Sequence, residues 1–160
     1  MKWEYIVISK MTDLESLPYH LLLDADPSRK MVDDYVSRGE TFVARNEDEM
    51  IGVYVLIRTR PGTVELVNLA VDEAYQGQGL GKKLVLDAIN KAKTMGAKTV
   101  ELGTGNAGIG QLALYQKCGF RIVGVDRDFF LRHYEEEIYE NGMPCIDMIR
   151  LALDLESEDA

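Results

Sequence analysis

A glycine-rich turn between a strand-like run and an amphipathic helix is the feature that most restricts how this chain can fold. The turn reads Gln76-Gly77-Gln78-Gly79-Leu80-Gly81, which places three glycines within five residues. Residues 63–71 before it are rich in β-branched residues and predict a strand. The apolar residues after it recur at helical spacing: Leu80, Leu84, Val85, Ala88, Ile89 and Ala92. Because the first N–H groups of a helix have no partner within it, the turn predicts either a phosphate site or a tight connection that uses glycine for its geometry alone.

The rest of the pattern predicts an α+β fold, with a mostly antiparallel mixed sheet of about six to seven strands and helices on both faces. Short turns allow only antiparallel neighbours in the middle of the chain, whereas the helix after the glycine turn makes a parallel crossover. We expect one domain over residues 1–160. Strands are predicted over residues 3–9, 41–45, 51–59, 63–71, 99–102, 120–125 and 148–155, and helices over 17–23 (capped by Asp13), 30–37, 80–95 and 110–118.

Charge and composition narrow the partners and the location. The net charge of −9, from 27 acidic and 18 basic residues, argues against nucleic acid as a partner. A negative surface would attract a cationic substrate, but many proteins are acidic only because the charge keeps them soluble. No apolar run suits a membrane span, and no signal peptide is evident. The lone cysteines Cys118 and Cys145 indicate neither a metal site nor a disulfide framework, so a cytoplasmic location is expected.

The sequence of the glycine turn does not match two other phosphate-binding motifs. A Walker loop needs a hydroxyl residue after Gly81-Lys82, but Lys83 stands there. A dinucleotide fingerprint needs glycine where Lys82 stands, although Glu101 lies at the distance expected of a ribose-binding acid. An NAD-type dinucleotide-binding enzyme is therefore a minor alternative.

The glycine turn resembles the acyl-CoA motif of the GCN5-related N-acetyltransferase (GNAT) superfamily, Gln/Arg-x-x-Gly-x-Gly/Ala. A second stretch, Ala113-Leu114-Tyr115-Gln116-Lys117-Cys118-Gly119-Phe120, resembles that superfamily's helix ending in A-L-Y-x-x-x-G-F. The order and spacing of the two motifs fit, and the resemblance covers at least residues 51–125. It is nearest to a small bacterial subgroup with no assigned substrate.

The resemblance implies an acetyl-CoA-dependent N-acyltransferase. It would move an acetyl group to a primary amine of a small molecule or peptide, by direct attack in a ternary complex. A non-catalytic acyl-CoA-binding sensor is the alternative, and a homodimer is left open. The strand's main chain would pair with the pantetheine arm of coenzyme A, and the amides of residues 77–82 would wrap the pyrophosphate. The residues expected to bind the cofactor are Leu69, Ala70, Val71, Gln76, Gly77, Gln78, Gly79, Leu80, Gly81, Lys82 and Asn106.

The resemblance also points to catalytic residues. Tyr115 matches the family's proton donor to the departing sulfur, although a helical tyrosine is more often packed against a sheet. Glu65 lies six residues before Val71, where the histone-acetylating branch carries its general base. Glu65 is equally expected to be only a cross-strand charge partner on a solvated face of the sheet. Glu101, on the neighbouring predicted strand, is a second candidate for the base.

One position departs from the family's pattern. Many relatives carry an asparagine seven residues before the tyrosine, where this chain has Gly108, so Asn106 is the candidate substitute contact to the pantetheine arm. Residues 24–39 and 126–143 are expected to line the acceptor cleft. The second of these combines aromatic side chains with acids, which suits a cation but also describes a solvated hairpin.

Overall fold

The structure, a computed structural model, describes residues 3–155 of the chain. Seven strands form one sheet in the order β1-β2-β3-β4-β5-β9-β6, and β7 pairs with β8 in a separate two-stranded sheet. Every pairing is antiparallel except that of β4 with β5. The predicted mixed, mostly antiparallel sheet is confirmed. The strands are β1 (Val7–Met11), β2 (Glu40–Asn46), β3 (Glu49–Arg60), β4 (Thr63–Val71), β5 (Thr99–Gly105), β6 (Arg121–Asp126), β7 (Tyr139–Glu140), β8 (Met143–Pro144) and β9 (Met148–Asp154).

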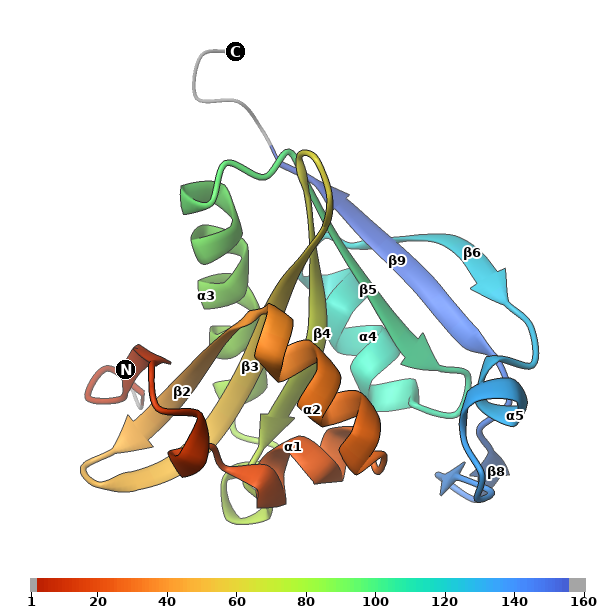
Figure 1. The fold of residues 1–160 in the computed structure, drawn as a ribbon, viewed down its shortest axis with the longest axis horizontal. Helices are drawn as coiled ribbons and strands as arrows, with labels where there is room; N and C mark the ends of the chain where they lie inside the picture. Colours follow the sequence, from red (N-terminus) through yellow and green to blue (C-terminus); the bar gives the residue numbers. More distant parts are fainter. Residues whose placement is uncertain (1–2, 156–160) are drawn as a thin grey trace.

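Helices cover both faces of the large sheet, as predicted (Figure 1). On one face, α3 and α4 pack against the central strands. On the other, α1 and α2 cover β3 and β4. None of the helices within residues 3–155 is long and apolar enough to cross a membrane. The helices are α1 (Tyr19–Ala25), α2 (Arg29–Arg38), α3 (Leu80–Thr94), α4 (Ile109–Lys117) and α5 (Phe129–His133), with 3-10 turns at Leu14–Ser16 and Glu73–Tyr75.

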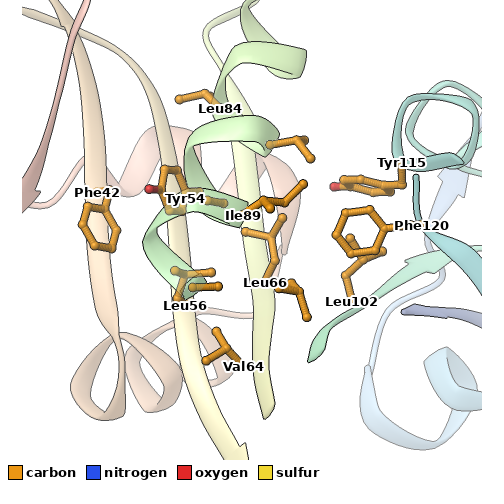
Figure 2. Packing of buried hydrophobic residues seen from close by; sticks show 14 of the residues in the cluster. Phe42, Tyr54, Leu56, Val64, Leu66, Leu84, Ile89, Leu102, Tyr115 and Phe120 are labelled. Carbon is orange, nitrogen blue, oxygen red and sulfur yellow. The ribbon is translucent and has the colours of Figure 1, made fainter. Parts of the chain in front are cut away.

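The apolar stripe of α3 builds the larger of two cores. Its predicted residues are all buried against β3 and β4, and burial of each leucine, isoleucine or valine side chain among them stabilises the fold by about 1.5–3 kcal/mol. Figure 2 shows this layer with Phe42 and Tyr54 on one side of it, their ring centroids 4.9 Å apart. The hydroxyl of Tyr54 donates to Asp87 of α3 at 2.6 Å. The core therefore fixes α3, and with it the glycine turn, against the sheet.

Two N-terminal predictions are wrong. The first strand begins at Val7, not at residue 3, because Trp3 leaves the sheet and packs against Tyr75 with ring centroids 6.0 Å apart. Asp13 caps the 3-10 turn Leu14–Ser16, not the helix α1. That helix starts only at Tyr19 because Leu17, which precedes a proline, is held in an extended conformation.

Candidate functional site

The sheet opens between its two parallel strands. The pairing of β4 with β5 covers only Thr63, Val64 and Glu65 on the β4 side. Val67 is an extra residue in β4, because Leu66 and Asn68 face consecutive residues of β3. Such a bulge bends a strand and raises its twist. After Glu65, β4 and β5 therefore diverge, as Figure 1 shows for their C-terminal ends.

A cleft of about 1370 Å³ extends from this opening to the glycine turn. Its walls come from β4, the start of α3, β5, α4 and β9, together with residues of the two segments predicted to line an acceptor site. Most of the predicted site residues line it, whereas Gln78, Leu80 and Asn106 do not. Those that do are Glu65, Leu69, Ala70, Val71, Gln76, Gly77, Gly79, Gly81, Lys82 and Tyr115.

The glycine turn forms one end of the cleft. Gly77 and Gly79 have φ angles of 73° and 90°, a region that disfavours other residues, so the chain turns there because both lack a side chain. Gly79 is the N-cap of α3 and no side chain caps the helix, so its first N–H groups stay available to an anion. Among the contacts that hold the turn, the Trp3 indole donates to the Gln78 carbonyl at 2.7 Å, and the Gln76 amide donates to the Val71 carbonyl at 2.9 Å. The geometry fits a pyrophosphate held by backbone amides.

The edge of β4 that faces the opening forms the wall beside the turn. The Val71 carbonyl points to this edge, where it meets the Gln76 side chain. Alternate residues of a strand direct their main-chain groups to the same side, so those of Leu69 point there too. Among the described strands, none pairs with this edge of β4 beyond Glu65. An amide-bearing arm such as pantetheine fits here as an added strand would.

Tyr115 lies at the junction of the cleft and the core. Its ring packs edge-on against Phe120, with centroids 6.1 Å apart, and only 7% of the residue is exposed. In Figure 2 the hydroxyl points away from α4 and toward β4. Burial raises the pKa of Tyr115 to about 12. The side chain therefore combines the packing role with a protonated hydroxyl that borders the cleft.

The two candidate bases lie in different surroundings. Burial raises the pKa of Glu65, as does the nearby Glu101, while Arg150 and Arg38 oppose the shift. Glu65 lines the cleft. Glu101 is outside it, in a shallow hollow beside β6, and its carboxylate forms an ion pair with Arg60. The proposal of Glu101 as a base is therefore dropped.

The structure does not support Asn106 as a cofactor contact. Its amide oxygen accepts hydrogen bonds from the backbone N–H groups of Ile146 and Asp147 at 2.7 and 3.0 Å. Its amide nitrogen donates to the Pro144 carbonyl at 3.2 Å. Both ends of the side chain thus hold the segment that leads into β9. Leu80 is a core residue with only 1% of its surface exposed, so its side chain is closed to a ligand.

A polar network, not predicted from the sequence, forms the far end of the cleft. Asp26 accepts hydrogen bonds from the hydroxyls of Tyr35 and Tyr134 at 3.1 and 2.8 Å. The buried Asn68 donates to Tyr35 and to the Leu22 carbonyl, and its amide oxygen has no partner among the described residues. A polar residue within the apolar run from Leu66 to Val71 was the available signal for Asn68.

The predicted acceptor segments do line the cleft, through residues of α2, α5 and the loop before α2. Of the glutamates in the second segment, Glu140 lines the cleft, whereas Glu135, Glu136 and Glu137 are exposed and stand outside the lining. They follow α5, which turns its aromatic residues Phe129 and Phe130 to the cleft. The cleft therefore combines these aromatic rings with only one of the four glutamates, Glu140.

Comparison with known proteins gives a consistent result. Residues 8–120 match the Acetyltransferase (GNAT) family. A Bacillus subtilis (strain 168) protein, named as the uncharacterized N-acetyltransferase YvbK, is 64% identical over 86% of this chain and 88% of its own length. The IAA acetyltransferase from Bacillus cereus ATCC 14579 superposes with a TM-score of 0.91 at 54% identity, over 94% of this chain and 99% of that one. A GNAT family acetyltransferase from Elizabethkingia anophelis, solved with acetyl-CoA bound, has a TM-score of 0.92 at 45% identity, over 95% and 99%.

These matches agree with the opened mixed sheet and with the uncapped helix start behind the glycine turn. The minor alternative of a dinucleotide enzyme is wrong, because its doubly wound parallel sheet is absent from the described residues. The chain belongs to the GNAT acetyltransferase family.

Proposed function

We propose that this protein transfers the acetyl group of acetyl-CoA to a primary amine, which attacks directly in a ternary complex. One observation carries the proposal: a single cleft joins the uncapped start of α3, the unpaired edge of β4, Tyr115 and Glu65. The cofactor is assigned by the family and by the acetyl-CoA bound to the Elizabethkingia relative.

Different residues of the cleft would bind different parts of the cofactor. The N–H groups at the start of α3 would hold its pyrophosphate, with the exposed Lys82 adding positive charge nearby. The main chain of Leu69 and Val71 would pair with its amides. When bound, acetyl-CoA supplies an activated thioester carbonyl and a thiol leaving group.

Glu65 acts as the base for the acceptor. An amine attacks only when neutral, and an alkyl ammonium has a pKa of about 10.4, so its proton must be taken up near the cleft. The raised pKa of Glu65 makes its carboxylate a better proton acceptor than an exposed one. It takes the proton directly or through a water molecule.

Tyr115 acts on the leaving group. A thiol has an ordinary pKa of about 8.5, well below that of Tyr115, so the tyrosine keeps its proton at neutral pH. Its hydroxyl thus donates a hydrogen bond to the negative charge that develops on a departing sulfur.

The experiment that tests this function separates binding from turnover. Acetyl-CoA at a hundred times its Kd should stabilise the fold by about 2.7 kcal/mol, a rise in Tm of about 5–10 °C, whereas NAD should have little effect. Thiol release from acetyl-CoA is then followed with a panel of amines. Binding without thiol release for any amine would favour the sensor alternative. A cytoplasmic location and a homodimer stay predictions.

A further inference from the structure

Arg150 of β9 differs from Arg38, the other arginine among the residues that line the cleft. Arg38 forms an ion pair with Asp34. The Arg150 guanidinium lines the cleft, yet it forms no hydrogen bond or ion pair with any residue in the described range 3–155. A guanidinium offers five N–H donors, and those of Arg150 are not buried, so they stay open to solvent and to a ligand. The guanidinium is therefore available to an anionic group of a ligand.

A glycine of the neighbouring strand β5 makes room for this side chain. Arg150 pairs with Gly103 of β5 on one side and with Gly124 of β6 on the other. A Cβ at position 103 would stand 2.5 Å from the Met148 sulfur and 3.2 Å from Nη1 of Arg150, so both side chains lie over this glycine, whereas a Cβ at position 124 would meet nothing. Its Cζ lies 5.5 Å from the centre of the Phe129 ring. The fold thus holds the charge at a defined place in the cleft wall.

Arg150 and Glu65 present opposite charges to the same cleft without neutralising each other. Glu65 is the register partner of Glu101 in β5 and Arg150 that of Gly103, two residues further along the same strand, so both side chains leave the same face of the sheet. They do not approach within the 4.0 Å of an ion pair. A ligand with a cationic and an anionic group separated by a few bonds would satisfy both.

We infer that the acceptor is an amine that also carries a carboxylate, an amino acid or a compound like it, whose carboxylate is bound by Arg150 while its amine faces Glu65. The inference rests on the proposed function. Guanidinium and carboxylate match in shape and form paired hydrogen bonds. The ring of Phe129 beside the guanidinium gives an apolar surface for the acceptor's carbon skeleton.

The same geometry disfavours a polyamine. A second ammonium group would lie against Arg150, and like charges in a partly dry cleft repel. The hydrogen bonds that Asp26 accepts from Tyr35, Tyr134 and the Ser28 N–H leave its negative charge in place, and Glu140 also lines the cleft. Rates with diamines therefore decide whether these acids outweigh Arg150.

The test compares acceptors that differ only in the carboxylate. The kcat/KM for each of the common amino acids is measured beside that for its carboxamide, with a diamine panel as a third set. Amidation also lowers the pKa of the amine and raises its neutral fraction, so this bias runs against the expected result. For at least one amino acid the carboxylate should be preferred by about 10- to 100-fold.

Arg150→Gln should bring that preference close to one, through a rise in KM for the carboxylate, with kcat for the carboxamide and the thermal shift by CoA retained. Arg132→Gln, which removes an exposed arginine already paired with Asp126, should keep the preference. With CoA present, the preferred amino acid should also raise the Tm of the native protein but not that of Arg150→Gln.

Two failures are distinguishable. Efficient acetylation of carboxamides or diamines, with a ratio that Arg150→Gln leaves unchanged, would overturn the inference and leave the acetyltransferase intact. A protein that neither shifts with acetyl-CoA nor acetylates any amine would overturn the proposed function and this inference with it.

Discussion

Glu65 of β4 and Glu101 of β5 are register partners at the last pair before the two strands diverge, yet they serve different surfaces. Glu101 is neutralised by Arg60 beside a shallow hollow, whereas Glu65 lines the cleft and is partly buried. The divergence of β4 and β5 begins at this pair. From the sequence alone both carboxylates are candidates for the general base, and only their surroundings in the fold distinguish them.

Glu65→Gln should change both rate and stability, in opposite directions. The variant should lose kcat/KM near neutral pH and recover part of it as pH rises and supplies the neutral amine. Because burial raises the folded-state pKa above 4.5, the carboxyl's contribution to stability is full below that value and is lost as pH rises through the folded-state pKa. The variant should therefore have the higher Tm at about pH 8, with the difference vanishing toward about pH 4. Unfolding scans across that range check the sign, and a variant less stable than the native protein at pH 8 contradicts it.

Tyr115→Phe should lower kcat by about 10- to 100-fold, the worth of one hydrogen bond to a developing charge. The ring and its packing on Phe120 are kept, so Tm and the Kd for CoA should change little. With the native pKa at about 12, the rate loss should not be rescued between about pH 6 and 10. Single-turnover rates are the decisive measurement, because slow product release would mask the effect on kcat. A native single-turnover rate would remove Tyr115 from the chemistry.

Gly79→Asp should weaken CoA binding by about 100-fold or more, equal to about 2.7 kcal/mol, because it places a carboxylate at the anion-binding start of α3. Gly62→Asp is the matched control. Gly62 also has a positive φ, of 76°, and open space around it, but it lies outside the cleft. Both variants carry the same charge change and similar backbone strain. Equal CoA titration curves for the two would place the pyrophosphate elsewhere.

Asn106→Ala should destabilise the fold by about 1–3 kcal/mol, since two backbone N–H groups before β9 lose their acceptor. Asn106→Asp keeps an acceptor for both N–H groups but places a carboxylate oxygen against the Pro144 carbonyl, so it should also be destabilised. Denaturant unfolding measures the difference, and CoA titration should give the native Kd for both variants. An alanine variant of native stability with weakened CoA binding would restore Asn106 as a cofactor contact.

The sequence by itself determined the parts that depend on local rules. The helical spacing from Leu80 to Ala92 fixes which face of α3 is buried, and the glycines at 77 and 79 fix the turn before it. Strand period and short turns fix the antiparallel order of β2, β3 and β4. These features involve residues only a few positions apart, so a short window of sequence contains the whole cause.

The tertiary structure decided which polar residues share a site. Trp3 bonds to Gln78 across the turn, and Asn106 is committed to residues 144–147. Arg150 reaches the cleft because it crosses Gly103 of a neighbouring strand. Each of these contacts joins residues about 40 or more positions apart in the chain, and no local pattern encodes such pairings. The motif therefore identified the cofactor end of the cleft, while the packing of β9 and α5 against the opened sheet decided what the acceptor end presents.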